Sequence, residues 1–240
     1  MKRFVRTLFD FLFPPLCHIC RSFIPDATEL HICSSCREKL SYVASPLCPI
    51  CGIPFAGVGE DHICGACQTH PPHFDYARAY LLYEGAGRDL IHAFKYRYKT
   101  HLRRPLGLLL LEGLEKFLRE RAVDLLIPVP LHRSRLRIRG FNQAQLLCAQ
   151  VSERLSIPIL PDGLVRTRPT QPQVELSATE RRNNVKGAFA VKHPQQVTGR
   201  KILLLDDVMT TGSTVDECAG ELKKCGATSV TVVTVARTAR

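Results

Sequence analysis

The 240-residue chain is long enough for one large domain or two smaller ones, and its 45% hydrophobic content is ordinary for a globular protein. With 33 Lys and Arg against 22 Asp and Glu, the net charge of +11 favours polyanionic partners such as nucleic acid or phosphorylated metabolites. No apolar run reaches the roughly 18 residues of a membrane helix, which argues against a membrane-spanning protein. A basic protein without a polyanionic partner is the alternative.

The N-terminal stretch MKRFVRTLFDFLFPPLC has a basic start and an apolar run, as a secretion signal has. However, Asp10 interrupts the run, Pro14 and Pro15 end it, and no small-residue cleavage site follows. We therefore expect a short helix packed on its own domain in a cytoplasmic protein. A contact of this segment with a membrane or a partner protein is the alternative.

Eight of the 11 cysteines form two copies of C-x2-C-x12-C-x2-C, 31 positions apart. Each copy supplies four thiolates, which suit a tetrahedral zinc ion and leave no open position for catalysis. The regular repeat favours two sequential structural sites over an interleaved arrangement. The predicted ligands are Cys17, Cys20, Cys33 and Cys36 for the first site, and Cys48, Cys51, Cys64 and Cys67 for the second. Disulfides, which a cytoplasmic location disfavours, and an iron–sulfur cluster are the alternatives.

The cysteine repeat predicts a small zinc-bound domain over residues 1–70, followed by a second domain over residues 71–240. Few large apolar side chains occur before residue 70, and structural zinc contributes about 10–16 kcal/mol per site in small peptides. We therefore expect the first domain to unfold without its metal. The other three cysteines are predicted to be inert core thiols.

Residues 87–99 have a helical pattern with an apolar face and a basic face. Four residues of this segment are predicted DNA contacts: Arg88, Lys95, Arg97 and Lys99. Tyr96 and Tyr98 lie beside them in the sequence and could stack on bases. A solvated basic face and core tyrosines are the alternative. A leucine-rich helix is predicted over 105–121.

After residue 123, short apolar runs alternate with helical patterns. The predicted strands are 124–130, 163–167, 187–191, 201–207 and 229–236, and the predicted helices are 142–155 and 212–226. Continuous apolar strands that alternate with helices are typical of a parallel sheet covered on both faces. The sequence therefore predicts an α/β fold.

The stretch ILLLDDVMTTGST, residues 202–214, joins a buried strand to a helix. Asp206 and Asp207 follow the apolar residues of the strand, where ligands bind in such sheets. Their carboxylates can accept hydrogen bonds from sugar hydroxyls or reach a hydrated magnesium ion. The turn into the helix offers backbone amides and hydroxyls for a phosphate, through Thr210, Thr211, Gly212, Ser213 and Thr214. A sugar phosphate fits both halves, whereas simple helix capping, the alternative, needs only one carboxylate.

This stretch resembles the 13-residue signature of type I phosphoribosyltransferases, which bind 5-phosphoribosyl-1-pyrophosphate (PRPP). The resemblance implies a parallel sheet flanked by helices and a ligand carried as its Mg²⁺ complex. It also implies that Asp206 and Asp207 hold the ribose hydroxyls and that residues 210–214 hold the 5-phosphate. With residues 128–147, residues 170–189 and the double zinc ribbon in front, the whole chain resembles the ComF family, which is tied to natural competence and the use of external DNA.

Six arginines are candidates for binding pyrophosphate or belonging to a mobile loop: Arg133, Arg135, Arg137, Arg139, Arg181 and Arg182. The first four alternate in the sequence, so an extended segment would place them on one face. The last two lie in the polar segment 167–185, which resembles the loop that closes over the ligand in this fold. Solvated surface charge is the alternative for all six.

Three functions follow from the resemblance. The first is an enzyme that displaces pyrophosphate from ribose C1 with a nitrogen nucleophile; Thr210 stands where 6-oxopurine transferases carry an acidic residue, which disfavours a purine acceptor. The second is a PRPP-sensing module that binds single-stranded DNA through its basic residues. The third is an assembly factor that docks on a DNA-uptake motor or helicase.

Overall fold

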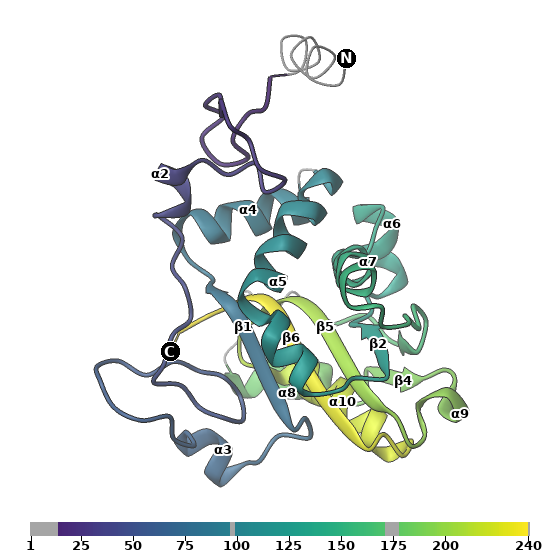
Figure 1. Cartoon of the computed structure of the whole chain (residues 1–240). Helices are drawn as coiled ribbons and strands as arrows, with labels where there is room; N and C mark the ends of the chain where they lie inside the picture. The colour runs from purple at the N-terminus through teal and green to yellow at the C-terminus, as the bar shows by residue number, and fades with distance from the viewer. Residues whose placement is uncertain (1–13, 97–98, 171–177, 240) are drawn as a thin grey trace.

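A computed structural model describes residues 14–96, 99–170 and 178–239 of the chain (Figure 1). Its centre is a four-stranded, all-parallel sheet with the spatial order β1-β6-β5-β2. The strands are Tyr76–Leu82 (β1), Leu125–Pro128 (β2), Lys201–Met209 (β5) and Ser229–Arg237 (β6). The predicted α/β fold is therefore confirmed. The predicted N-terminal helix lies outside the described residues.

Helices cover both faces of the sheet because its strands alternate between two apolar cores. Leu203 and Leu205 pack into the core beneath α4 (Gly85–Tyr96), α5 (Arg103–Glu120) and α7 (Gln143–Leu155). Ile202 and Leu204 pack into the opposite core with α10 (Ser213–Lys224). In the described part of the chain, no helix has both the length and the hydropathy of a membrane span.

The remaining elements are short. Two of the predicted strands form a separate antiparallel pair, β3 (Leu164–Arg166) and β4 (Phe189–Val191), instead of joining the central sheet. The other elements are α2 (Ser34–Arg37), α3 (Gly65–Thr69), η1 (Thr100–Leu102), α6 (Arg133–Arg139), α8 (Ala178–Val185) and α9 (Pro194–Val197).

Two glycines allow α5 to lie close to its neighbours. A Cβ atom at Gly113 would lie 1.9 Å from the ring of Tyr80 on β1, and one at Gly107 would lie 2.7 Å from Gln150 on α7. Both distances are too short for any side chain, which accounts for glycine inside a helix despite its cost of about 1 kcal/mol.

The cysteines form the two sequential groups that the repeat predicts. Within each group, all four sulfur atoms lie within 4.8 Å of one another. The Cys20–Cys33 and Cys51–Cys64 sulfur pairs are 3.7 Å apart, too far for a disulfide. Tetrahedral zinc with bonds of about 2.3 Å sets its sulfurs about 3.8 Å apart. Both groups therefore fit structural zinc sites.

The first cysteine group is continuous with the main core. Leu30, Cys36 and Leu40 belong to the same buried cluster as Leu90 and Phe94 of α4. In addition, the backbone of residues 41–43 pairs with β1: Val43 N–H donates to the carbonyl of Tyr80, and Leu82 N–H donates to that of Ser41. The first cysteine group therefore helps to hold α4 in place. The division of the chain at residues 70 and 71 stays a prediction.

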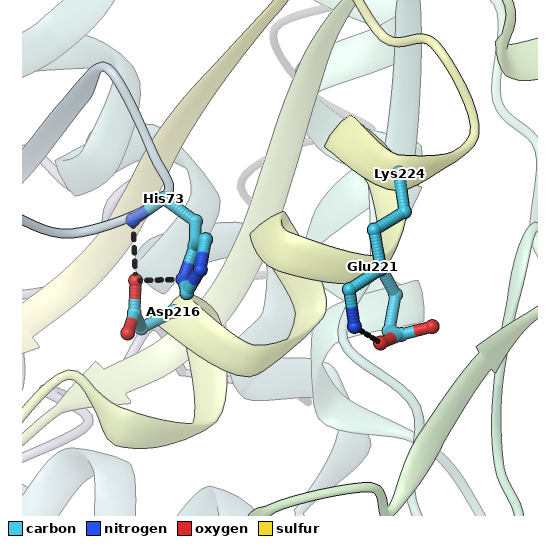
Figure 2. Close-up of polar contacts among 4 residues, drawn as sticks. All are labelled: His73, Asp216, Glu221 and Lys224. Atoms are coloured by element: carbon cyan, nitrogen blue, oxygen red, sulfur yellow. Dashed lines mark hydrogen bonds and ion pairs between the residues drawn. The ribbon is translucent and has the colours of Figure 1, made fainter.

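The connector between the second cysteine group and β1 is fastened to α10. Asp216 accepts hydrogen bonds from the backbone N–H of His73 at 2.6 Å and lies 3.1 Å from Nδ1 of its ring (Figure 2). Two residues later, Asp75 pairs with Lys223 at 2.8 Å. One turn beyond Asp216, Glu221 and Lys224 form a pair on the helix surface (Figure 2). The contacts of His73 and Asp75 with α10 hold the second cysteine group beside the sheet.

Replacing one buried ligand should unfold the first cysteine group and loosen α4. We expect Cys36→Ser to lower the zinc content from about two ions per chain to about one, because three thiolates bind zinc far more weakly than four. Elemental analysis measures the zinc, and hydrogen exchange should show lost protection in residues 14–43 and in α4.

Cys225→Ser is the matched control, since Cys225 is half-buried and belongs to neither group. Retention of both zinc ions by Cys36→Ser, or an equal loss in the control, would contradict the structural role.

Candidate functional site

A cavity of about 490 Å³ opens at the carboxyl ends of β2 and β5. This is the edge at which ligands bind in parallel α/β sheets, and the volume is within the usual range of small-molecule sites. Side chains from α4, α6, β3, α8 and the turn after β5 also line it. One end of the cavity carries carboxylates and the other carries guanidinium groups.

The carboxylate end consists of Asp206 and Asp207. Both are inside β5, which continues to Met209, so the strand is two residues longer than predicted. Strand alternation places Asp207 on the face covered by α4 and Asp206 on the face covered by α10. Asp207 is 5% exposed, and the Asp206 carboxylate accepts a hydrogen bond of 2.8 Å from the Asp207 backbone N–H.

Lys95 neutralises part of this buried charge. Its Nζ lies 2.9 Å from Oδ1 of Asp207, and only 18% of its side chain is exposed. Lys95 is near the end of α4, so the last turn of this helix lines the cavity. Lys95 therefore lies at the cavity instead of on an exposed basic face of α4, and its predicted contact with DNA stays a prediction.

The charges of this group shift the pKa values of its members. Burial, then the neighbouring Asp207 charge, raises the pKa of Asp206 to about 7, although Lys95 acts in the opposite direction. Burial lowers the pKa of Lys95, but the charges of Asp207 and Asp206 outweigh it and the net shift is upward. Lys95 is therefore a cation, and Asp206 takes up a proton near neutral pH.

The turn after β5 leads directly into the N-terminus of α10. Gly212, the residue before the helix, has φ of 83°, a left-handed conformation that glycine adopts without strain. The hydroxyl groups of Thr211 and Ser213 are 2.8 Å apart, while Thr210 and Thr214 line the cavity. The turn thus offers hydroxyls and the first amides of a 12-residue helix to an anion.

Four arginines form the opposite end of the cavity: Arg135, Arg139, Arg166 and Arg181. Arg135 donates to the backbone carbonyl of Thr170 at 3.0 Å, and Arg166 donates to the Thr170 hydroxyl. Burial followed by Arg139 lowers the pKa of Arg135, and burial followed by Arg135 lowers that of Arg166. The charge of Arg139 destabilises that of Arg135, and the charge of Arg135 destabilises that of Arg166, so an anion placed among them would be favoured.

Three buried donor groups of this cavity have no hydrogen-bond partner among the residues that the structure describes. They are Nε of Arg166, Nε of Arg181 and Nε2 of Gln143. An unpaired buried donor costs about 1–3 kcal/mol, so native structures rarely keep several together without a ligand or water. Their grouping at one cavity indicates a ligand with several acceptor oxygens.

Gln143 is held rigidly at the start of α7. Asn142 caps the helix through the Ala144 N–H at 3.1 Å and donates to the carbonyl of Val129 at 3.0 Å. Gln143 is only 2% exposed, and its Oε1 accepts a 2.8 Å hydrogen bond from Arg139. The Arg139 guanidinium also lies over the ring of Tyr96, 5.0 Å from its centre.

The arginine-rich segment is a helix, not the extended segment that the alternating arginines predicted. Residues 133–139 form α6, in which residues four apart share a face. Arg135 and Arg139 consequently line the cavity, whereas Arg133 and Arg137 are exposed elsewhere. Two of the four arginines therefore lie at the cavity, and their binding of pyrophosphate stays a prediction.

The other predicted residues are distributed as follows. Arg181 lines the cavity and Arg182 is exposed. Arg88 is exposed on α4, and Lys99 is half-buried next to η1. Arg97, Tyr98 and part of the predicted loop, residues 171–177, lie outside the described residues.

Two of the polar cavity residues with unpaired donor groups, Arg166 and Gln143, were not among the site residues predicted from the sequence. Arg166 follows an unremarkable apolar pair in β3, and only the β3–β4 fold brings it to the cavity. Gln143 was predicted only as part of a helix, because nothing in the sequence distinguishes it from any other polar residue in a first helical turn. The RGFN sequence before it, which suggests a turn into a helix, was the one local signal.

Two family models match the chain. The double zinc ribbon domain matches residues 8–68, and the phosphoribosyl transferase domain matches residues 144–240. The second match contains the aspartate pair, the turn, Arg166 and Arg181. The two matches account for the cysteine groups and for most of the cavity.

The chain also has relatives among proteins of known name. It is 41% identical over 154 residues to the DNA utilization protein YhgH of Escherichia coli O157:H7, and 38% identical over 152 residues to competence protein F of Haemophilus influenzae. Each match spans 62% of this chain and 66% of the relative, just under two thirds of its length.

A purine phosphoribosyltransferase from Pyrococcus horikoshii aligns with 55% of this chain and 83% of its own, at 18% identity and a TM-score of 0.37. That similarity is too low to add to the family matches. The models and relatives together confirm the family resemblance. The chain is a ComF homologue with a double zinc ribbon followed by a phosphoribosyltransferase domain.

Proposed function

We propose that the cavity binds PRPP as its Mg²⁺ complex and that the protein serves the use of external DNA. The observation that carries the proposal is the division of one cavity into a carboxylate end and an arginine end, with the anion-binding turn of α10 beside them. PRPP has the matching groups: ribose hydroxyls, a 5-phosphate and a pyrophosphate. The DNA role is taken from the names of the homologues.

In this proposal each part of the ligand has a chemically matched partner. Asp206 and Asp207 accept hydrogen bonds from the ribose hydroxyls, and a carboxylate has enough acceptor sites for Asp207 to keep Lys95 as well. Residues 210–214 hold the 5-phosphate. Arg135, Arg166 and the Gln143 amide donate to the pyrophosphate, which satisfies the unpaired Nε of Arg166 and Nε2 of Gln143.

Phosphoribosyl transfer is the reaction that such a complex would support. The bond between C1 and the pyrophosphate oxygen would break, a nitrogen nucleophile would bond to C1, and pyrophosphate would leave with the bonding electrons. The arginines would stabilise the departing charge, and Mg²⁺ would neutralise the phosphates while bound. Pyrophosphate release in the presence of an acceptor distinguishes a transferase from a protein that only binds PRPP.

We further propose that the protein acts in the cytoplasm on single-stranded DNA, with a DNA-uptake motor or helicase as a possible assembly partner. The net charge of +11 supports a polyanionic partner. Of the four predicted DNA contacts, Arg88 keeps an exposed position, whereas Lys95 belongs to the PRPP cavity. Any DNA surface must therefore use basic residues other than Lys95.

The decisive test is calorimetric titration of the zinc-loaded chain with PRPP and Mg²⁺. We expect the wild type to bind and the double variant Asp206→Asn with Asp207→Asn to bind at least tenfold more weakly, about 1.4 kcal/mol. Asp206→Asn alone keeps the Lys95–Asp207 pair and should lose part of the affinity. Asp89→Asn, a surface change on α4, is the control. Absence of binding by the wild type would refute the proposal.

The two faces of α6 provide a second test. Arg135→Gln removes a cavity cation and should weaken Mg·PRPP binding about tenfold, with a much smaller effect on ribose 5-phosphate, which lacks the pyrophosphate. Arg137→Gln removes the same charge from the exposed face and should change the affinity less than twofold. Equal effects of the two variants would indicate that only long-range charge matters.

The raised pKa of Asp206 predicts a pH dependence of stability. Its pKa rises from 3.8 to about 7 on folding, so between these values the folded chain holds a proton that the unfolded chain has released. Stability should therefore fall as pH rises through this window, by up to about 1.4 kcal/mol per pH unit. Thermal unfolding of the ligand-free protein at pH 6 and pH 8 should show this loss in the wild type and in Asp89→Asn. The loss should be smaller in Asp206→Asn; an equal loss there would assign it to another group.

A further inference from the structure

A second cavity, of about 320 Å³, lies between the first cysteine group and the beginning of α5. Residues of the segment from His18 to His31 form one wall, and His101, Arg104 and Pro105 form the other. It shares no lining residue with the cavity at the end of β5. Neither the zinc sites nor the proposed PRPP site uses its side chains.

Three imidazole rings meet in this cavity. The ring of His18 lies in the middle, with its centre 5.8 Å from that of His31 and 5.4 Å from that of His101. Nδ1 of His18 is buried and has no hydrogen-bond partner within residues 14–96, 99–170 and 178–239. A neutral imidazole carries one N–H donor, so the three rings can offer donors without being protonated.

The surroundings of the rings are strongly basic. Arg104 lines the cavity, and Arg21 and Lys99 are close enough to act electrostatically on His18 and His101. Among the described residues that line the cavity, Glu29 is the single carboxylate, and it pairs with Arg104 at 2.8 Å.

A metal ion is the first alternative for a histidine cluster, but the geometry does not favour it. In the described part of the chain, the groups of side chains with ligand atoms within 4.8 Å of one another are the two cysteine groups. The nitrogens of the three histidines do not form such a group. Divalent cations would also be repelled by the three surrounding basic residues.

We propose that this cavity binds a phosphate group, held by the imidazole N–H donors of His18, His31 and His101 and by the Arg104 guanidinium. The Thr28 hydroxyl, which also lines the cavity, is a further donor. An entering phosphate would compete with Glu29 for Arg104. The phosphate can belong to a free phosphate or mononucleotide or to a nucleic-acid strand, since the recognising chemistry is the same. The proposal is independent of PRPP binding.

The test uses the full-length, zinc-loaded chain with ¹³C-labelled histidine, so that each imidazole reports its own surroundings by NMR. Single His→Gln variants assign the signals. Titration with inorganic phosphate should shift the signals of His18, His31 and His101, whereas chloride at equal ionic strength should not. Because the readout is local, phosphate that binds in the cavity at β5 does not imitate the result.

Three substitutions make the test specific. None of them replaces a cysteine ligand or a residue that lines the β5 cavity. Arg104→Gln should raise the phosphate dissociation constant at least fivefold. Arg103→Gln, the neighbouring charge-matched control that does not line the cavity, should change it less than twofold. Glu29→Gln should lower it, because the competing carboxylate is gone; a metal site would instead lose affinity in this variant.

Absence of local shifts, equal effects of Arg103→Gln and Arg104→Gln, or weaker binding in Glu29→Gln would each overturn the proposal. So would a titration in which additional zinc, but not phosphate, moves the three signals. Thymidine, thymidine 5′-phosphate and an oligothymidine then distinguish the sources. Shifts with both phosphorylated ligands but not with thymidine support the phosphate site, and tighter binding of the oligothymidine identifies a nucleic-acid strand as the source.

Discussion

The site depends on how the fold stabilises two adjacent carboxylates on a buried strand. Asp206 and Asp207 follow four fully buried apolar residues of β5, and burying an unpaired charge costs several kcal/mol. Lys95 offsets part of that cost from α4, 112 positions earlier in the chain. The sheet can therefore end in negative charge only if α4 is held in place above it.

The placement of α4 explains why metal-binding groups precede the sheet. Leu90 and Phe94 of α4 pack in the same core as Leu30, Cys36 and Leu40 from the first cysteine group. A cross-linked block therefore supports the helix that delivers Lys95. A zinc ion held by this group would lie outside the cavity and would act on the aspartates through this packing. The same contact creates the histidine cavity, because His18 and His31 flank the cysteines and His101 follows α4.

The parts of the fold that could be predicted from the sequence are those with local signals. The cysteine spacing, the apolar run of β5 and the turn at residues 210–214 each carry their chemistry within a short stretch, and the parallel sheet follows from their periodicity. The position of Lys95 in the cavity could not be predicted, because a basic residue on an amphipathic helix is normally solvated. The alternation of arginines in α6 was misleading for a similar reason. An extended segment would place all four arginines on one face, whereas a helix places Arg135 and Arg139 on a different face from Arg133 and Arg137.

The arginine end of the cavity is better explained by a ligand than by stability. No ion pair within the described part of the chain involves Arg135, Arg166 or Arg181, although the sequence contains 22 acidic residues. Instead, burial and then a neighbouring guanidinium lower the pKa of Arg135 and of Arg166, and among the described residues the buried Nε atoms of Arg166 and Arg181 have no hydrogen-bond partner. A core selected for stability alone would have replaced or paired them. Since the opposite wall already holds carboxylates, a molecule with hydroxyls at one end and phosphates at the other, as in the proposed PRPP complex, would stabilise both ends of the cavity.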